Sequence, residues 1–277
     1  MPLTDTQSDA IIAAVREVAA AEIVPRFRNL TGDDIDEKSS FDDLVTVADT
    51  AAEAALTARI RAILPGDNVV GEEAVAADRS VLDRVGQGRT TVIDPIDGTW
   101  NFAHGIANYG VIVAVVEEGE TVWGLLYDPS FDDWTVAHRG QGAWVHRGGK
   151  RRRLTTDPAD APFDRLRGNV GAYLYPSALQ PGLAATSHLF RRATSMGASL
   201  HEYRLLAQGA SDFCLNGLLH VWDHAAGVLI LQEAGGVSRL LDGTEYAPTM
   251  REGRLLNARS EPIWQALAAR FNAALDV

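Results

Sequence analysis

Asp94 and Asp97 are the two residues whose type and spacing most directly suggest chemistry. They follow Thr91-Val92-Ile93, a β-branched apolar run that is typical of the end of a buried strand. Pro95 fixes the backbone between the two carboxylates. Carboxylate oxygens are the ligands that Mg²⁺, a hard cation, prefers. The pair therefore predicts a metal site at the end of a strand.

Gly98 and Thr99 follow this acidic pair directly. Gly98 allows a tight turn, and Thr99 is a favourable N-cap for a helix. Free backbone N–H groups at a helix start can hold a phosphate. One short segment thus predicts a metal site and an anion site side by side. The alternative is an ordinary strand-to-turn junction, where Asp, Pro and Gly are common.

Two further acidic segments favour the metal site. Glu72 follows an apolar run ending at Gly71, so it is expected to point inward, whereas Glu73 is expected to be solvated. Asp223 lies near the start of a predicted helix that runs to about Ala234. It is either the N-cap or a metal ligand offered from the second half of the chain. His224 is not expected to be a co-ligand, since adjacent helical residues point in different directions.

Thr46 and Asp49 stand near the start of a long Ala-rich helix that is expected to end about Leu64. Such residues are favoured as helix caps. The functional alternative is that Asp49 faces the acidic turn and acts on a water or a metal. Local chemistry leaves both interpretations open.

Composition indicates a globular protein. Of the 277 residues, 46% are hydrophobic and 22% are charged. No apolar run is long enough to span a bilayer, so no membrane association is expected. The polar start, Met1 to Asp9, does not resemble a secretory signal. Cys214 is the only cysteine, which excludes an internal disulfide and a thiolate metal cluster. A cytoplasmic location is expected.

The net charge of −12 argues against binding to a nucleic-acid polymer, which needs a basic surface. The basic run Lys150-Arg151-Arg152-Arg153 follows two glycines and is interpreted as a solvated hairpin or linker. An acidic protein that handles an anionic substrate needs metal ions or local N–H groups to offset repulsion.

The elements that position these residues divide the chain into two predicted halves. Residues 1–150 show a helix from Ser8 to Arg28, capped by Ser8 or Asp9, and then β-rich runs that predict an antiparallel sheet, an α+β layout. Residues 151–277 alternate strands and helices, which indicates an α/β layout. Ligands then lie beyond the carboxyl ends of the strands.

Together these segments resemble the inositol monophosphatase family of Mg²⁺-dependent phosphatases. The resemblance covers most of the chain, and four motifs in the family's order carry it. It implies a layered αβαβα sandwich of the sugar-phosphatase type. The motifs are Lys38-Ser39-Ser40 with Asp43 through Asp49, Gly71-Glu72-Glu73, Asp94-Pro95-Ile96-Asp97-Gly98-Thr99 through Phe102, and Trp222-Asp223-His224-Ala225-Ala226-Gly227.

The resemblance also implies metal ligands. Glu72, Asp94 and the Ile96 carbonyl would bind the first Mg²⁺. Asp94, Asp97 and Asp223 would bind the second. Glu72 would help to hold a weaker third ion through water, and Mn²⁺ is a possible substitute. Cations would neutralise carboxylates that would otherwise take up protons.

It implies catalytic and substrate contacts as well. Thr99 and Asp49 would orient and deprotonate the nucleophilic water, with Glu72 also counted among the catalytic residues. The N–H groups of Gly98 and Thr99 would hold the phosphate, and Lys38 would lie near the site. No residue of the protein need become phosphorylated, since metal-bound positioning and charge stabilisation suffice.

Four positions concern the substrate. Trp100 replaces the usual second threonine and would narrow the pocket, stack on a ring, or pack against the sheet. In many members that favour inositol, an acidic residue precedes the Trp-Asp motif, and the nearest aligned positions here are Leu215 and Asn216. Ser199 falls where members bind the substrate ring, so it is a candidate contact.

The expected activity is hydrolysis of a small phosphorylated metabolite, with inositol monophosphate or a related polyol or sugar phosphate first. Histidinol phosphate, fructose bisphosphate and phosphoadenosine phosphate are alternatives. A catalytically silent member that binds metal and anion is the competitor from another class. Inhibition by Li⁺ and homodimerisation are implied by the resemblance alone.

Overall fold

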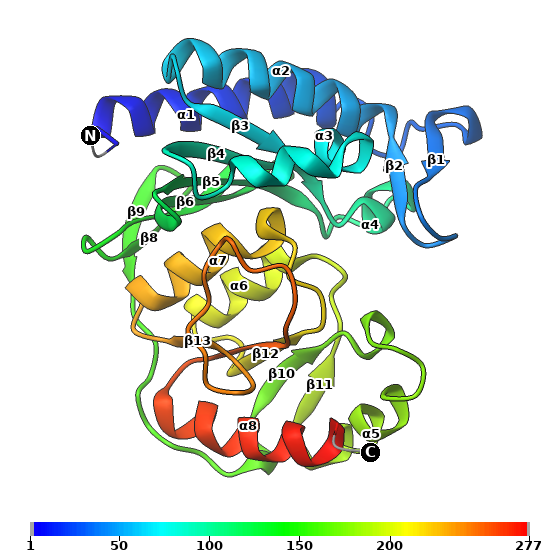
Figure 1. The fold of residues 1–277 in the computed structure, drawn as a ribbon, viewed down its shortest axis with the longest axis vertical. Coiled ribbons are helices and arrows are strands. Elements are labelled where there is room, and N and C mark those ends of the chain that lie inside the picture. Colours follow the sequence, from blue (N-terminus) through cyan, green and yellow to red (C-terminus); the bar gives the residue numbers. More distant parts are fainter. Residues whose placement is uncertain (1–2, 276–277) are drawn as a thin grey trace.

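Helices and sheets alternate in layers, and this computed structural model describes residues 3–275 (Figure 1). Two helices cover the outer face of a seven-stranded sheet, two more lie between that sheet and a five-stranded sheet, and another covers the far face of the second sheet. The predicted αβαβα sandwich is confirmed. In layer order these helices are α1 (Asp5–Val18) with α2 (Val47–Ile63), α6 (Ser199–Ala207) with α7 (Val221–Glu233), and α8 (Glu261–Leu275).

The first sheet has the order β3-β4-β5-β6-β7-β8-β9, so its strands are neighbours in sequence order. Only β3 and β4 run parallel; the other neighbours are antiparallel, as the hairpin signals predicted. The strands are β3 (Asn68–Gly71), β4 (Arg89–Asp97), β5 (Gly110–Glu117), β6 (Glu120–Asp128), β7 (Asp133–His138), β8 (Ala143–Arg147) and β9 (Lys150–Leu154).

The second sheet has the order β11-β10-β12-β14-β13. β10 is parallel to both β11 and β12, in agreement with the predicted α/β alternation, whereas β14 is antiparallel to β12 and β13. The strands are β10 (Arg167–Val170), β11 (Arg192–Thr194), β12 (Phe213–Asn216), β13 (Val237–Leu240) and β14 (Leu255–Ala258).

Short elements connect these layers. A two-stranded antiparallel ribbon precedes α2, and single-turn helices join the longer elements. They are β1 (Ile35–Glu37), β2 (Leu44–Thr46), α3 (Glu72–Ala77), α4 (Thr99–Ala103), α5 (Gln180–Ala184), the π-helix η1 (Ala19–Ile23), and the 3₁₀ helices η2 (Gly32–Asp34), η3 (Arg79–Arg84), η4 (Phe163–Arg165), η5 (Ala172–Leu174) and η6 (Ser187–Leu189).

The first sheet is buried on both faces. Along β5, Val113 and Val115 belong to the core shared with α1 and α2, while Ile112 and Ala114 belong to the core shared with α6 and α7. This alternation follows from the two-residue period of a strand. It explains the continuous apolar run of the sequence, because a sheet covered on both faces needs apolar residues at every position.

Gly124 on β6 brings α7 unusually close to the sheet. A Cβ atom at Gly124 would lie 2.8 Å from the Cα atom of Ala226, so a larger residue would push the helix away. α7 also carries Asp223 in its first turn. The close contact therefore fixes the distance between Asp223 and the end of β4. None of the described helices is long and apolar enough to cross a membrane.

The start of the first helix differs from its prediction. α1 begins at Asp5, and Thr4 is its N-cap in a capping box with Gln7, so the prediction of Ser8 or Asp9 was wrong. Ser8 is instead buried, and its hydroxyl oxygen accepts a hydrogen bond of 2.9 Å from Trp123 Nε1. Several residues near this end can cap a helix, and the contact with Trp123 decides which of them lies inside.

The basic run at residues 150–153 is a strand, not a linker. β9 pairs antiparallel with β8 through the turn at Gly148 and Gly149, so the hairpin interpretation is confirmed. Charged side chains suit an edge strand because they discourage pairing with other chains. The division of the chain at residue 150 stays a prediction. α7 comes from the second half of the sequence but contacts the first sheet.

Candidate active site

β4 brings Asp94 and Asp97 to the same side of the sheet through an irregularity. Residues three apart on a regular strand point to opposite faces. Here Asp94 is opposite Ile112 and Asp97 is opposite Gly110, so β4 uses one residue more than β5. Such a bulge restores the common direction of the two side chains. Pro95 favours the interruption, since it has no N–H to donate to the ladder.

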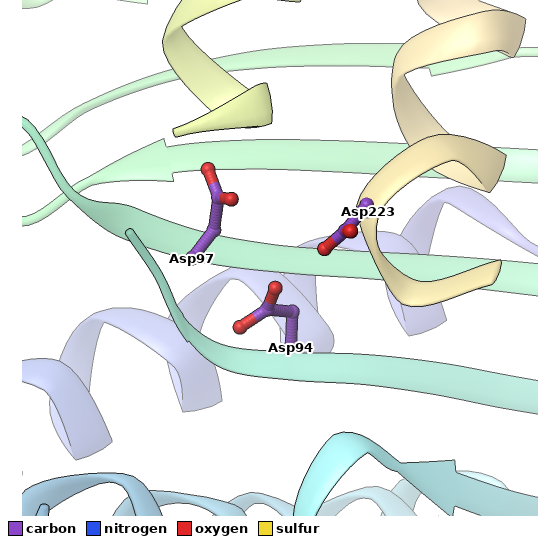
Figure 2. A group of neighbouring side chains, drawn as sticks. All are labelled: Asp94, Asp97 and Asp223. Carbon is purple, nitrogen blue, oxygen red and sulfur yellow. The ribbon is translucent and has the colours of Figure 1, made fainter. Parts of the chain in front are cut away.

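Asp223 completes a group of three carboxylates. Its side chain reaches from the first turn of α7 toward Asp94 and Asp97, as Figure 2 shows. One oxygen from each of the three lies within 4.8 Å of the others. The N-cap interpretation of Asp223 was wrong, because His220 holds that position. His220 Nδ1 lies 3.5 Å from Asp223 Oδ2.

The charges of this group require compensation. Burial, reinforced by the neighbouring acids, raises the pKa of Asp94 well above its usual range and that of Asp97 to about 8. Burial is the largest single effect on Asp223 and acts to raise its pKa, but the hydrogen bond and charge of His220, together with His224 and Asp94, lower the Asp223 pKa on balance. Asp94 Oδ1 is buried and has no hydrogen-bond partner among the described residues. An orphaned buried oxygen in an all-oxygen donor set fits a hard divalent cation.

Asp49 forms the predicted cap and also faces the acidic turn, while its action on a water or a metal stays a prediction. Its Oδ2 accepts hydrogen bonds from the Thr46 backbone N–H (2.9 Å) and the Thr46 hydroxyl (2.6 Å), which forms a capping box at the start of α2. Its Oδ1 accepts a hydrogen bond of 3.0 Å from the Thr99 hydroxyl. Burial raises the pKa of Asp49 to about 6. The cap holds the carboxylate in place and leaves one oxygen for Thr99.

Gly98, not Thr99, is the N-cap of α4, which corrects the prediction. Gly98 has φ +84°, a left-handed conformation that glycine adopts without strain. A Cβ atom there would lie 2.9 Å from the Asn108 carbonyl oxygen. Thr99 is the first helical residue, and its hydroxyl also lies 2.9 Å from the Ile96 carbonyl oxygen. This turn aims Thr99 at Asp49.

These side chains open into one cavity of about 620 Å³. Both halves of the chain line it, since α4 and the end of β4 face α6, α7 and β12 across it. A concave site with a few converging polar groups is the usual form of a small-molecule site. Among its lining residues are Glu72, Asp94, Ile96, Asp97, Gly98, Thr99, Trp100, Ser199 and Asp223.

Comparison with known proteins agrees with this geometry. A family model described as the inositol monophosphatase family matches residues 5–276. The chain belongs to the inositol monophosphatase family. The family relatives carry the names of phosphatases, and this protein is a phosphatase of the same family. The resemblance drawn from the motifs is confirmed.

Relatives and solved structures support the family assignment over the full length. A fructose-1,6-bisphosphatase/inositol-1-monophosphatase of Thermotoga maritima is 30% identical over 77% of each chain. An inositol-1-monophosphatase of Caulobacter vibrioides is 29% identical over 95% of this chain and 100% of its own. A solved inositol monophosphatase of Zymomonas mobilis is 25% identical, with a TM-score of 0.79 over 97% of this chain and 99% of that chain.

In this inositol monophosphatase family member, Glu72 lies near the three aspartates but does not belong to the group whose oxygens converge. Its Oε1 accepts a hydrogen bond of 2.9 Å from Lys38 Nζ. Glu73 accepts another of 2.7 Å from the same ammonium and is mostly buried, so the prediction that Glu73 is solvated was wrong. Burial raises the pKa of Glu73 to about 7. Lys38 lies near the site as predicted, and the role of Glu72 as a metal ligand stays a prediction.

Ser199 lines the cavity and also supports Asp97. Its backbone N–H and its hydroxyl each lie 3.0 Å from Asp97 Oδ1, and Leu200 N donates to Asp97 Oδ2 at 2.7 Å. These three donors come from the first turn of α6. A contact from Ser199 to a substrate ring stays a prediction, since its hydroxyl has this partner already.

Trp100 lies at the cavity wall with 44% of its surface exposed. It stacks on His104, with 4.1 Å between ring centroids, so it does not pack against the sheet. The other two interpretations, a narrower pocket or a platform for a ring, remain open. Of the two aligned positions before the Trp-Asp motif, Asn216 lines the cavity, whereas Leu215 is in the core under α8.

Both ring nitrogens of His224 have hydrogen-bond partners within the protein. Its two ring nitrogens lie 2.7 Å from the Leu218 carbonyl oxygen and 3.1 Å from the Tyr203 hydroxyl, so neither is available to a metal. The sequence reasoning missed His220 and Glu202. Helical spacing of three residues from Asp223 and from Ser199 is the signal that points to them.

Proposed function

We propose that this protein hydrolyses a small phosphate monoester with bound Mg²⁺. One observation carries the proposal: the converging oxygens of Asp94, Asp97 and Asp223, one from each within 4.8 Å of the others, share a cavity with Thr99, whose hydroxyl contacts the buried Asp49 behind it. A divalent cation fits the first group, and the second group has the form of a nucleophile-orienting pair.

The residues that would hold the metal are Asp94, Asp97 and Asp223, joined by Glu72 and by the Ile96 carbonyl. Two to three Mg²⁺ ions, or Mn²⁺ in their place, suit this number of oxygen ligands. When bound, such ions supply the positive charge that offsets repulsion between these acids and a phosphate, and they acidify water. Ser199 and Leu200 hold Asp97 ready for this role through three hydrogen bonds.

Thr99 and Asp49 would prepare the attacking water. A hydroxyl has one proton, so the Thr99 hydroxyl donates either to Asp49 or to the Ile96 carbonyl. When it donates to Asp49, its lone pairs accept a proton of the water, and Asp49 is the base at the end of this chain. The N–H groups of Gly98 and Thr99 would hold the phosphate, and Lys38 would balance the charge of Glu72.

The substrate we propose is inositol monophosphate or a related polyol or sugar phosphate. The support is the name of the relatives, which include inositol-1-monophosphatases and a fructose-1,6-bisphosphatase/inositol-1-monophosphatase. Histidinol phosphate, fructose bisphosphate and phosphoadenosine phosphate are the other candidates. A catalytically silent metal and anion binder is disfavoured, since binding alone does not need the contact between Thr99 and Asp49.

The test is phosphate release by Asp94→Asn over a panel of these esters. We expect Mg²⁺-dependent turnover to fall by at least about 100-fold, and Mn²⁺ binding followed by calorimetry to weaken with it. Asp33→Asn, an exposed aspartate on η2, is the matched control and should leave both unchanged. Undiminished turnover in a folded Asp94→Asn variant would refute the site assignment.

We further propose a cytoplasmic homodimer that Li⁺ inhibits by competing at the second metal position. Light scattering measures the mass in solution, and a monomer would contradict the dimer. Titration of LiCl into the Mg²⁺-dependent assay tests the inhibition, with KCl at equal ionic strength as the control.

A further inference from the structure

Glu202 is a cavity-lining carboxylate that the proposed hydrolysis does not use. It lies on α6 and is 7% exposed. Among residues 3–275, no Lys, Arg or His forms an ion pair with it. A buried carboxylate without a cation is costly, and an apolar residue would fill a purely structural position better. A role in binding therefore explains a carboxylate at this position better than a structural role does.

Its hydrogen bonds come from neutral donors, one of which is a weakly donating thiol. Oε2 accepts from the Cys214 thiol at 2.8 Å, and Oε1 accepts from the Met196 backbone N–H at 3.3 Å. A contact from Asn216 also favours the charged form, although burial, the larger effect, raises the pKa of Glu202. An ionised carboxylate offers about four acceptor positions, and a thiol is a weak donor. At least one acceptor position thus remains for a group in the cavity.

Asn216 forms the other part of this polar corner. Its Oδ1 lies 3.2 Å from both the Cys214 thiol and Asn257 Nδ2, so its position is fixed by two neighbours. Like Glu202 it is 7% exposed and lines the cavity. The corner is therefore rigid and built before any ligand binds, which lowers the cost of binding.

The corner lies at a defined place relative to the three aspartates. Glu202 is one helical turn after Ser199, so the two side chains share a face of α6 about 5–6 Å apart. Ser199 contacts Asp97 directly. A phosphate near Asp97 would thus place the organic part of a small ester, a six-membered ring for example, against Glu202.

We propose that Glu202, held in place by Cys214 and Asn216, determines specificity by accepting a hydrogen bond from a hydroxyl of the substrate. The ligand class is a polyol or sugar phosphate; an ester without such a hydroxyl leaves the carboxylate buried and unmatched. This inference rests on the proposed function. A site built to bind a hydroxyl discriminates strongly against analogues that lack it.

The test compares Glu202→Gln with the unaltered protein on two esters, inositol 1-phosphate and phenyl phosphate, which has a ring without hydroxyls. Glutamine keeps the size and an acceptor oxygen but loses the charge. We expect kcat/KM for inositol 1-phosphate to fall about 10- to 100-fold, while kcat/KM for phenyl phosphate stays within about 2-fold. Glu120→Gln, the same exchange at an exposed position of β6, is the matched control and should change neither value.

The outcomes separate the two proposals. Equal losses on both esters, or no loss on either, would overturn the role of Glu202 while leaving the hydrolysis intact. No phosphate release from any ester by the unaltered protein would overturn the proposed function instead. If Glu202→Gln does not fold, Glu202→Asp is measured in its place; it keeps the charge but withdraws it from the cavity, so it must show the same selective loss.

Discussion

Asp49 and Thr99, which are 50 positions apart in the chain, are joined by a hydrogen bond of 3.0 Å between Asp49 Oδ1 and the Thr99 hydroxyl. The other oxygen of Asp49 is held by the cap at Thr46. One aspartate thus joins the start of α2 to the start of α4. Because the cap orients the carboxylate, its second oxygen can face Thr99 at no further cost in side-chain freedom.

Removal of the Thr99 hydroxyl should slow the chemical step. Thr99→Val keeps the shape but cannot pass a proton to Asp49, so we expect kcat to fall about 100- to 1,000-fold with little change in KM. Thr99→Ser keeps the hydroxyl and should retain most of kcat. Steady-state phosphate release measures both variants, and equal rates for Val and Ser would contradict a role for the hydroxyl.

The acid limb of the rate profile should report Asp49. Its raised pKa of about 6 comes from burial, and a base must be ionised to accept a proton. We therefore expect kcat/KM at saturating Mg²⁺ to fall as the pH drops below about 6. The profile is measured from pH 4.5 to 9. In Asp49→Asn this limb should be absent from the residual rate, and an unchanged limb would assign it to another group.

Metal-free protein should lose stability as the pH rises. The folded-state pKa of Asp97, about 8, is raised above the usual value of 3.8, so the folded state holds a proton that the unfolded state releases. This contribution is fully present below about pH 3.8 and is lost as the pH rises through about 8. Thermal unfolding in EDTA at pH 5, 7 and 9 should show a falling Tm.

Mg²⁺ should reverse this loss, since it binds the folded state and replaces the protons. The rise in Tm on adding Mg²⁺ should therefore be larger at pH 9 than at pH 5. Asp97→Asn removes the titrating group and should flatten the slope measured in EDTA. A Tm that does not depend on pH in the unaltered, metal-free protein would count against the buried acidic group.

Lys38 should stabilise the metal-free fold. Its ammonium donates to Glu72 and Glu73, and both carboxylates lose their cation in Lys38→Met. We expect the free energy of unfolding to fall by about 1–3 kcal/mol in EDTA, and by less with Mg²⁺, which would offset the freed charge of Glu72. Urea titration measures both values. Lys150→Met on the exposed edge strand β9 is the control, and equal effects of Mg²⁺ on both variants would argue against Glu72 as a ligand.

Gly98→Ala should lower the free energy of unfolding by more than backbone strain alone accounts for. A left-handed conformation costs an L-residue about 1–2 kcal/mol. At Gly98 the new methyl would also lie 2.9 Å from the Asn108 carbonyl oxygen and 3.0 Å from Ala198 Cβ. Gly88→Ala has φ +62° with nothing within 4 Å, so it isolates the strain. We expect the loss in free energy of unfolding, measured by urea titration, to be about 1–3 kcal/mol larger for Gly98→Ala than for Gly88→Ala. Gly98→Ala should also reduce turnover. Equal losses would mean that the turn at Gly98 can relax.

Features that depend on neighbours along the chain could be predicted from local sequence. Asp94 through Thr99 stand at the end of an apolar β-branched run, so a strand followed by an acidic turn could be predicted locally. The cap formed by Thr46 and Asp49 follows in the same way from a spacing of three residues. The order of the motifs along the chain was also enough to identify the family and its layered fold. Each of these motifs lies within a single short segment of the chain.

Contacts between groups that are far apart in the chain depend on how the layers pack, and local sequence does not predict them. The extra residue of β4 turns Asp94 and Asp97 to one side, and its presence depends on pairing with β5. Glu73 pairs with Lys38, and Glu202 reaches the cavity, because sheets and helices from distant segments pack there. The physical reason is that local propensities are set by a few adjacent residues, while burial and ion pairing are set by the whole packed core.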